Sequence, residues 1–155
     1  MPSVKPSLVI TDASCLIILN NIGYLELLPQ LFDIVITTPE IAREYGEAVP
    51  EWLKVIAVTN HSLEDELALI VDPGEASAIA LAHEIEIDYL VTDDLQARKL
   101  AVKLGLTIIG TLGILLKAKQ KGLIELLKPV LEQIVKTNFR TTAVLIENVL
   151  RDAGE

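Results

Sequence analysis

Short β-rich runs alternate along this chain with segments of helical periodicity, and this alternation limits the fold more than any other feature. The predicted strands are 7–11, 34–37, 55–58, 88–92 and 106–110. The predicted helices between them are 14–20, 23–31, 39–47, 62–70, 73–85 and 94–104. Strands that alternate with helices form βαβ units, so we expect an α/β fold with a mostly parallel central sheet.

The chain is predicted to be wholly helical after the last strand, with helices at 111–121, 123–136 and 140–152. Pro129 interrupts the apolar pattern of the second of these, and either starts a new helix or kinks an existing one. We therefore expect an α/β domain at 1–122 and a helical C-terminal extension at 123–155, packed on the same domain. The extension either covers one side of the sheet or forms an interface with a second subunit or a regulator.

Length and composition narrow the class of protein. A chain of 155 residues is long enough for one domain with a single core. No apolar run approaches the roughly 18 residues of a membrane span, and the N-terminus lacks a signal-peptide pattern. The single cysteine, Cys15, excludes an internal disulfide framework and is predicted to lie in the core. These features predict a cytoplasmic protein without membrane association.

Charge is distributed unevenly along the chain. Residues 1–94 carry 3 basic and 17 acidic side chains, whereas residues 95–140 carry 9 basic and 2 acidic ones. A strongly basic segment can attract a phosphate-bearing ligand even though the net charge of the chain is −9. The alternative is that its lysines only form the solvated faces of helices.

Carboxylates follow two of the predicted strands. Asp12 comes directly after the first strand, and the pair Asp93-Asp94 comes after the fourth. Open α/β sheets place their chemistry beyond the carboxyl ends of parallel strands, where gathered acids repel one another unless a cation joins them. Each of these acids also has an ordinary role as a helix N-cap, although two successive acids exceed what one cap requires. A divalent metal site is therefore predicted here, since hard cations take oxygen ligands.

Two glutamates on predicted helices are further candidates. Glu40 and Glu44 lie on one face of the same helix. Glu40 lies in the first turn, where the helix dipole alone favours an acid, whereas Glu44 lies one turn deeper and has less structural reason to be acidic. Glu75 follows Asp72-Pro73-Gly74, so a capping box would explain it equally well. The small residues after Glu75 allow its helix to approach its neighbours closely.

The order of these acids resembles the acidic signature of PIN-domain proteins. The segments that carry the resemblance are Asp12-Ala13-Ser14, Glu44, Gly74-Glu75-Ala76 and Thr92-Asp93-Asp94. The stretch from Gly74 through Gly110-Thr111-Leu112-Gly113 to Ile124 resembles a poorly characterised PIN-like subfamily with a helical C-terminal extension, similar to the VapC-like toxin ribonucleases. The resemblance covers about residues 7–153. It implies a three-layer α/β/α sandwich that gathers carboxylates around Mg²⁺ or Mn²⁺ and cuts RNA.

The resemblance also implies roles for individual residues. Asp12, Asp94, Glu44 and Asp93 would bind the metal, with either Asp93 or Asp94 as the inner ligand. Glu75 would complete the catalytic set, but it stands where the toxins usually have aspartate. Its extra methylene would move the carboxylate by about 1 Å or more, which matters for the strict geometry of Mg²⁺. The RNA contacts would come from Ser14, Arg98, Lys99 and Lys103.

Our leading hypothesis is therefore a Mg²⁺- or Mn²⁺-dependent endoribonuclease, the toxin of a toxin–antitoxin pair. RNA is the expected substrate, and the resemblance implies a homodimer and an antitoxin protein as a partner. The rival hypothesis is a catalytically weak or inactive PIN-like protein that serves as a protein-binding module. A phosphohydrolase of small phosphate esters is disfavoured because no Asp-x-Asp motif is present.

Overall fold

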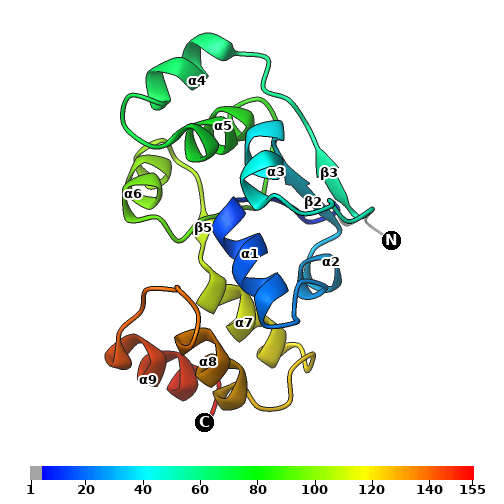
Figure 1. Cartoon of the computed structure of the whole chain (residues 1–155), viewed down its shortest axis with the longest axis vertical. Helices are drawn as coiled ribbons and strands as arrows, with labels where there is room; N and C mark the ends of the chain where they lie inside the picture. Colours follow the sequence, from blue (N-terminus) through cyan, green and yellow to red (C-terminus); the bar gives the residue numbers. More distant parts are fainter. Residues whose placement is uncertain (1–4) are drawn as a thin grey trace.

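The computed structural model describes residues 5–155, and within them every strand of the sheet is parallel (Figure 1). The order across the sheet is β3-β2-β1-β4-β5. This confirms the predicted α/β fold. The strands are β1 (Leu8–Thr11), β2 (Ile34–Thr37), β3 (Leu53–Val55), β4 (Tyr89–Val91) and β5 (Ile108–Ile109).

Helices connect the strands and surround the sheet. Helices α1, α3 and α5 contact one another in turn, α4 packs on α5, and α2 packs on α7. The bounds are α1 (Ala13–Asn21), α2 (Leu27–Leu31), α3 (Pro39–Tyr45), α4 (His61–Leu67), α5 (Pro73–Ala82), α6 (Leu95–Lys103), α7 (Thr111–Gln120), α8 (Lys128–Val135) and α9 (Ala143–Asp152). No helix within the described residues is long and apolar enough to span a membrane.

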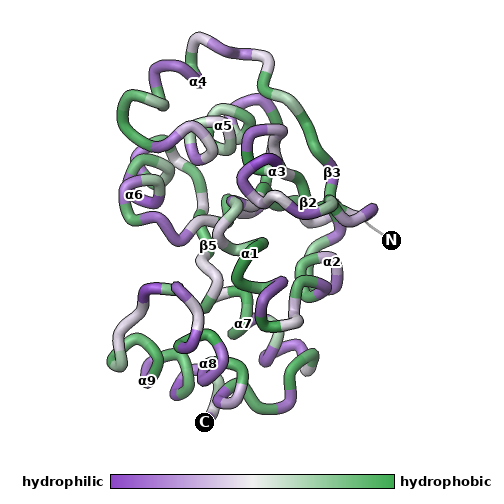
Figure 2. The backbone as a smooth tube through the Cα atoms, viewed as in Figure 1, coloured by the Kyte–Doolittle hydropathy of each residue, from purple (hydrophilic) through white to green (hydrophobic). Residues whose placement is uncertain are grey.

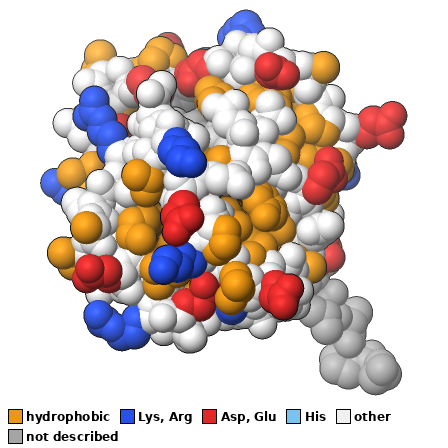
Figure 3. Space-filling model, turned by 60° about the horizontal axis from the view of Figure 1, so that its bottom comes forward, with side chains coloured by type: hydrophobic (Ala, Val, Ile, Leu, Met, Phe, Trp, Pro, Cys, Tyr) orange, Lys and Arg blue, Asp and Glu red, His pale blue; other side chains and the backbone are white. Residues whose placement is uncertain are grey.

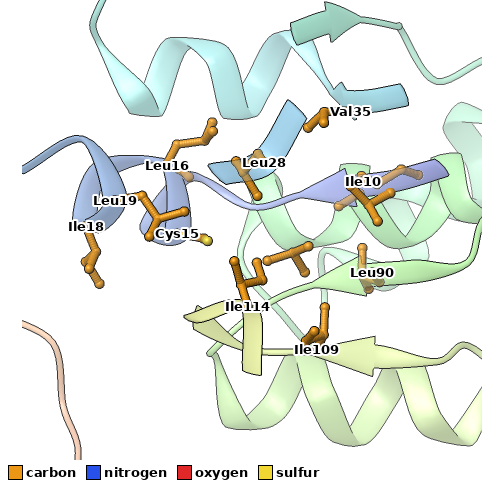
Figure 4. Close-up of a cluster of buried hydrophobic side chains, with 14 of the residues drawn as sticks. Ile10, Cys15, Leu16, Ile18, Leu19, Leu28, Val35, Leu90, Ile109 and Ile114 are labelled. Atoms are coloured by element: carbon orange, nitrogen blue, oxygen red, sulfur yellow. The ribbon is translucent and has the colours of Figure 1, made fainter. Parts of the chain in front are cut away.

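The core lies between the central strands and the helices that cover them. Ile10 of β1 and Leu90 of β4 are fully buried, as are Leu16 of α1 and Ile114 of α7. Figure 4 shows these side chains pointing toward one another, together with neighbours from β2, β5 and α2. Continuous apolar strands such as Leu-Val-Ile are typical of a parallel sheet that is covered on both faces. Cys15 is completely buried here, as predicted.

Local sequence signals explain where several helices begin and end. The Thr38 hydroxyl accepts a hydrogen bond from the Ile41 amide, and Pro39 takes the first position of α3. Asp72 caps α5 in the same way, with its carboxylate bound to the Glu75 amide at 2.8 Å. Gly105, after the end of α6, has φ of +84°, a conformation that favours glycine. All three starts and stops were predicted from the sequence.

Several element bounds differ from the prediction: α8 begins at Lys128 and not at residue 123, α5 ends at Ala82, and β5 is only Ile108–Ile109. Two further differences have a clear cause in the backbone. The third strand is Leu53–Val55, earlier than the predicted 55–58, because β2 ends at Thr37 and offers no partner beyond Ile56. Helix α2 begins at Leu27 and not at residue 23, because Gly23 has φ of +80° and leaves the helical conformation. Both differences arise at edges, where a few backbone hydrogen bonds decide the bounds.

The extension forms one end of the molecule, where α8 and α9 lie beyond α7 (Figure 1). Pro129 occupies the first turn of α8, so it starts this helix and does not kink one. The side chain of Glu155 accepts hydrogen bonds from the Leu127 and Lys128 amides and lies 3.2 Å from Lys119 of α7. These contacts fasten the end of α9 to the beginning of α8.

Apolar residues of the extension serve two purposes. One set joins the common core: Ile124, Leu127, Val130, Leu131, Ile134 and Val149. Another set stays exposed, including Leu126, Val135, Val144 and Leu145. Figure 2 shows the resulting mixture of hydrophobic and hydrophilic positions along α8 and α9. Figure 3, in which this end of the molecule is turned toward the viewer, shows hydrophobic side chains exposed on its surface.

Candidate active site

The sheet has a switch point between β1 and β4. From β1 the chain proceeds outward through β2 to β3, and it then crosses to β4 on the other side of β1. The connections after β1 and β4 therefore leave in opposite directions, which opens a crevice at the carboxyl edge of α/β sheets. Thr11 and Val91 are paired there, so Asp12 and Thr92 begin the two diverging connections.

Asp12 is fixed on both sides of its carboxylate. Its Oδ1 accepts the Cys15 amide at 3.0 Å, which makes it the N-cap of α1, and its Oδ2 accepts the Asp93 amide at 3.4 Å. The side chain is buried, with 2% of its surface exposed. Capping therefore accounts for the contact of one carboxylate oxygen, whereas the other oxygen faces the switch point.

Glu75 meets Asp12 from the first turn of α5. Its Oε2 accepts the Thr92 hydroxyl at 3.1 Å, and its carboxylate lies close enough to Asp12 for the charge of Asp12 to raise its pKa. Glu75 is also buried, at 7% exposure. The structure thus brings these two predicted residues together, and the longer side chain of glutamate does reach Asp12.

Burial and mutual repulsion make both carboxylates reluctant to ionise. Burial, assisted by the charge of Asp93, raises the pKa of Asp12 to about 7. Burial, assisted by the charge of Asp12, raises the pKa of Glu75 to about 9. At neutral pH the pair therefore retains a proton unless a cation takes its place.

The two adjacent acids after β4 have different environments. Asp94 is exposed and caps α6, with its Oδ2 bound to the Ala97 amide at 2.9 Å. Asp93 is partly buried, and its carboxylate accepts both the amide and the hydroxyl of Thr111 at the start of α7. Asp93 is therefore the acid in excess of capping, and its charge acts on Asp12.

Glu44 lies at the rim of the site. Its carboxylate lies over Gly74, where a β-carbon would come within 2.9 Å of the Glu44 Cδ. Partial burial and the charge of Asp72 raise the pKa of Glu44. Glu40, one turn earlier, has one oxygen 3.7 Å from Arg43, while its buried Oε2 has no hydrogen-bond partner among the described residues. Glu44 is thus adjacent to the residue that precedes Glu75.

The predicted RNA-contact residues are spread over two helices. Ser14 is exposed on α1, and Lys99 and Lys103 are exposed on α6. Arg98 donates to the Thr92 carbonyl at 3.3 Å, so its guanidinium lies beside the acidic site.

Two lysines of the basic segment have structural roles instead. Lys117 lies 5.1 Å from the centre of the Tyr89 ring, in a cation–π contact. Lys119 pairs with Glu155 and donates to the Glu125 carbonyl. Part of the positive charge of the basic segment is therefore engaged in contacts within the protein.

Threonines around the acids are the residues that sequence reasoning underrated. Thr92 orients Glu75 and Thr111 holds Asp93, and both are fully buried. A third, Thr38, is hydrogen-bonded to Ser77 at 2.7 Å. Their positions in the sequence could have identified them, because each threonine directly follows a strand or stands one residue beyond it. This is the edge of the sheet where the acids gather.

The donor set suits a hard divalent cation. Asp12, Glu75 and Asp93 offer only carboxylate oxygens, and none of them forms an ion pair with a described basic side chain. Within residues 5–155, no three histidine, cysteine or acidic side chains are close enough together to enclose a metal ion. Two carboxylates are nevertheless what Mg²⁺ commonly takes from a protein, because waters and substrate phosphates supply its other ligands. Asp12 and Glu75 therefore fit such an ion in charge and in chemistry.

The fold and the site define an α/β domain whose buried carboxylates lie at the switch point of a parallel sheet. A family model described as PIN domain matches residues 8–155, and the chain belongs to this family. PIN domains are generally nucleases. The search of curated proteins found no match.

Proposed function

We propose that this protein is a divalent-metal-dependent endoribonuclease that acts as the toxin of a toxin–antitoxin pair. The observation that supports the proposal most is the burial of two neighbouring carboxylates, Asp12 and Glu75, at the switch point. Two ionisable carboxylates buried side by side cost stability, and perturbed groups of this kind are concentrated at functional sites. Nuclease chemistry is the general activity of the family.

Each residue of the site has a distinct role in the proposed reaction. Asp12 and Glu75 would hold Mg²⁺ or Mn²⁺, which would lower the pKa of a water molecule and offset charge on the phosphate. The Asp93 amide and the Thr92 hydroxyl fix the orientation of these two carboxylates. Glu75 must give up its proton when a cation binds, so metal binding should release protons. Glu44 and Asp94 stand at the rim, where they can hold bound water.

Helix α6 supplies the contact with the RNA backbone. Arg98 lies next to the site, and Lys99 and Lys103 continue the positive charge along the exposed surface of the helix. Contacts of this kind position a phosphodiester without reading its sequence. We therefore expect RNA affinity to fall steeply with salt.

An RNA-cleavage assay with and without a chelator tests the activity. The purified protein should cut single-stranded RNA in Mn²⁺ or Mg²⁺, and Asp12→Asn and Glu75→Gln should each lose this activity while remaining folded. Asp65→Asn is the matched control, because Asp65 is an exposed acid on α4. Cleavage that survives the chelator, or that survives both site variants, would refute the proposal.

A second candidate function is a PIN-like protein-binding module with weak or no catalysis. It is favoured by the absence of a three-acid cluster within the described residues. It is also favoured by the existing contacts of the two adjacent acids, because Asp94 caps α6 and Asp93 is held by Thr111. Calorimetric titration with Mn²⁺ separates the two candidates. Binding at micromolar or low millimolar metal that disappears in Asp12→Asn favours the nuclease, and no binding favours the module.

The toxin role, the antitoxin partner and the homodimer need experiments of their own. Expression of the chain should arrest growth, and the product of the adjacent gene should relieve the arrest. Light scattering should give the mass of a dimer. Growth arrest by the Asp12→Asn variant would contradict a toxic nuclease activity.

A further inference from the structure

A cavity of about 390 Å³ lies beside the acidic site, at the junction of the α/β domain and the C-terminal extension. Asp93, Arg98 and the residues around Gly110 form one side of it. The other side comes from the extension, through the loop residues Phe139 and Arg140 and from α9. Its volume lies within the range of about 300–1,000 Å³ that is usual for small-molecule sites.

Two guanidinium groups line this cavity. Arg98 and Arg140 stand near the two ends of the basic segment in the sequence, yet the fold brings both to one cavity. Neither forms an ion pair with any described residue. Asp93 is the one acid on the lining, and its carboxylate is engaged by Thr111. The cavity therefore offers cationic hydrogen-bond donors suited to a phosphate.

The remaining walls are apolar and include one aromatic ring. Phe139 is half-buried and packs against the core, while Leu145 of α9 is 45% exposed at the cavity. Glycine at position 110 keeps the space near the acids open, because a β-carbon there would come within 2.7 Å of Arg98 Nη1. An aromatic ring, an apolar wall and two arginines together suit a flat heterocycle that carries a phosphate.

We propose that this cavity binds one nucleotide of single-stranded RNA, with its base against Phe139 and its phosphate at Arg98 and Arg140. Bases of single strands are commonly stacked on aromatic side chains. Since Asp93 lies on both the cavity wall and the acidic site, a nucleotide held here positions the adjoining phosphodiester near Asp12. The inference rests on the proposed function, and it gives the helical extension a role in substrate binding.

Binding is measured in the presence of a chelator, so that it does not depend on cleavage. The probes are fluorescein-labelled hexaribonucleotides of adenine or uracil, and the readout is fluorescence anisotropy. Phe139→Leu retains an apolar side chain but removes the ring, and it should weaken binding by about five- to a hundredfold. Arg140→Gln should weaken binding and lower the slope of log affinity against log salt by about one.

Arg151→Gln is the matched control for Arg140→Gln. Arg151 is an exposed arginine of α9 that is not part of the cavity lining, so its removal changes net charge equally. The control should leave affinity nearly unchanged. Thermal unfolding of every variant shows whether the extension stays folded.

The outcomes separate this inference from the proposed function. Chelator-resistant binding that requires Phe139 and Arg140, without metal-dependent cleavage, supports the nucleotide cavity and refutes the nuclease. Metal-dependent cleavage, with affinity and KM unchanged in Phe139→Leu and Arg140→Gln, supports the nuclease and refutes the nucleotide cavity. No binding of either hexaribonucleotide at millimolar concentration would overturn the inference, and a protein ligand would then be the next candidate for the cavity.

Discussion

The main-chain amide of Asp93 donates a hydrogen bond to the carboxylate of Asp12, across the switch point between β4 and β1. The same two residues repel each other through their side chains, because the charge of Asp93 contributes to the raised pKa of Asp12. The backbone thus stabilises the carboxylate that the neighbouring side chain destabilises. Carboxylates with a perturbed pKa are typical of functional sites, where the arrangement of charge serves a ligand.

Replacing Asp12 should separate its capping role from its charge. Asp12→Ala removes the N-cap of α1 and should cost about 0.5–2 kcal/mol in the free energy of unfolding. Asp12→Asn keeps an oxygen for the Cys15 amide and removes the repulsion, but its NH2 group cannot accept the Asp93 amide. Without metal it should therefore lose less stability than Asp12→Ala. Urea unfolding in a chelator measures both. A loss of stability in Asp12→Asn as large as that in Asp12→Ala would contradict the buried repulsion.

Stability without metal should fall as the pH rises. Because the pKa of Glu75 is raised to about 9 in the folded state, the folded chain binds more protons than the unfolded chain above about pH 4.5. The free energy of unfolding therefore decreases between about pH 4.5 and pH 9. Glu75→Gln cannot ionise and should show a flatter profile. Equal slopes for the two proteins, measured by urea unfolding in chelator at pH 6, 7.5 and 9, would contradict this.

Divalent metal should reverse that trend. A cation binds the deprotonated carboxylates, so its stabilising effect should increase with pH and should be absent in Asp12→Asn. At a metal concentration of about 100 times Kd, the expected gain is about 2.7 kcal/mol. Thermal unfolding with Mn²⁺ at pH 6.5 and 8 measures it. A gain that is larger at the lower pH would argue against binding at Asp12 and Glu75.

Gly74→Ala should displace the Glu44 carboxylate with little effect on the fold. The new β-carbon would meet the end of a flexible side chain, and alanine is the better helix residue by roughly 0.5–1 kcal/mol. If Glu44 assists the reaction, Gly74→Ala and Glu44→Gln should lower kcat by similar factors. Their double variant should be no worse than either, since both remove the same group. Additive losses would assign the two residues separate roles.

Local patterns in the sequence were enough to predict the local features of this protein. The apolar runs predicted the parallel α/β sheet, while Thr38, Asp72 and Gly105 predicted where helices begin or end, because hydrogen bonds within a few residues decide such features. The sequence also located acids at the ends of strands. At the edge of the sheet it was less reliable, and the third strand lies two residues earlier than predicted, since pairing with β2 decides its bounds.

Which of these local features lie together in space depends on the packing of the whole chain. The order of the strands results from long-range burial, and it alone places Asp12 against Asp93 and brings Glu75 to Asp12. It also distinguishes Asp94, which caps α6, from Asp93, which is held by Thr111. Arg98 and Arg140 meet at one cavity because the extension folds back onto α7. Contacts between distant segments depend on how the whole core packs, and no local pattern in the sequence encodes that packing.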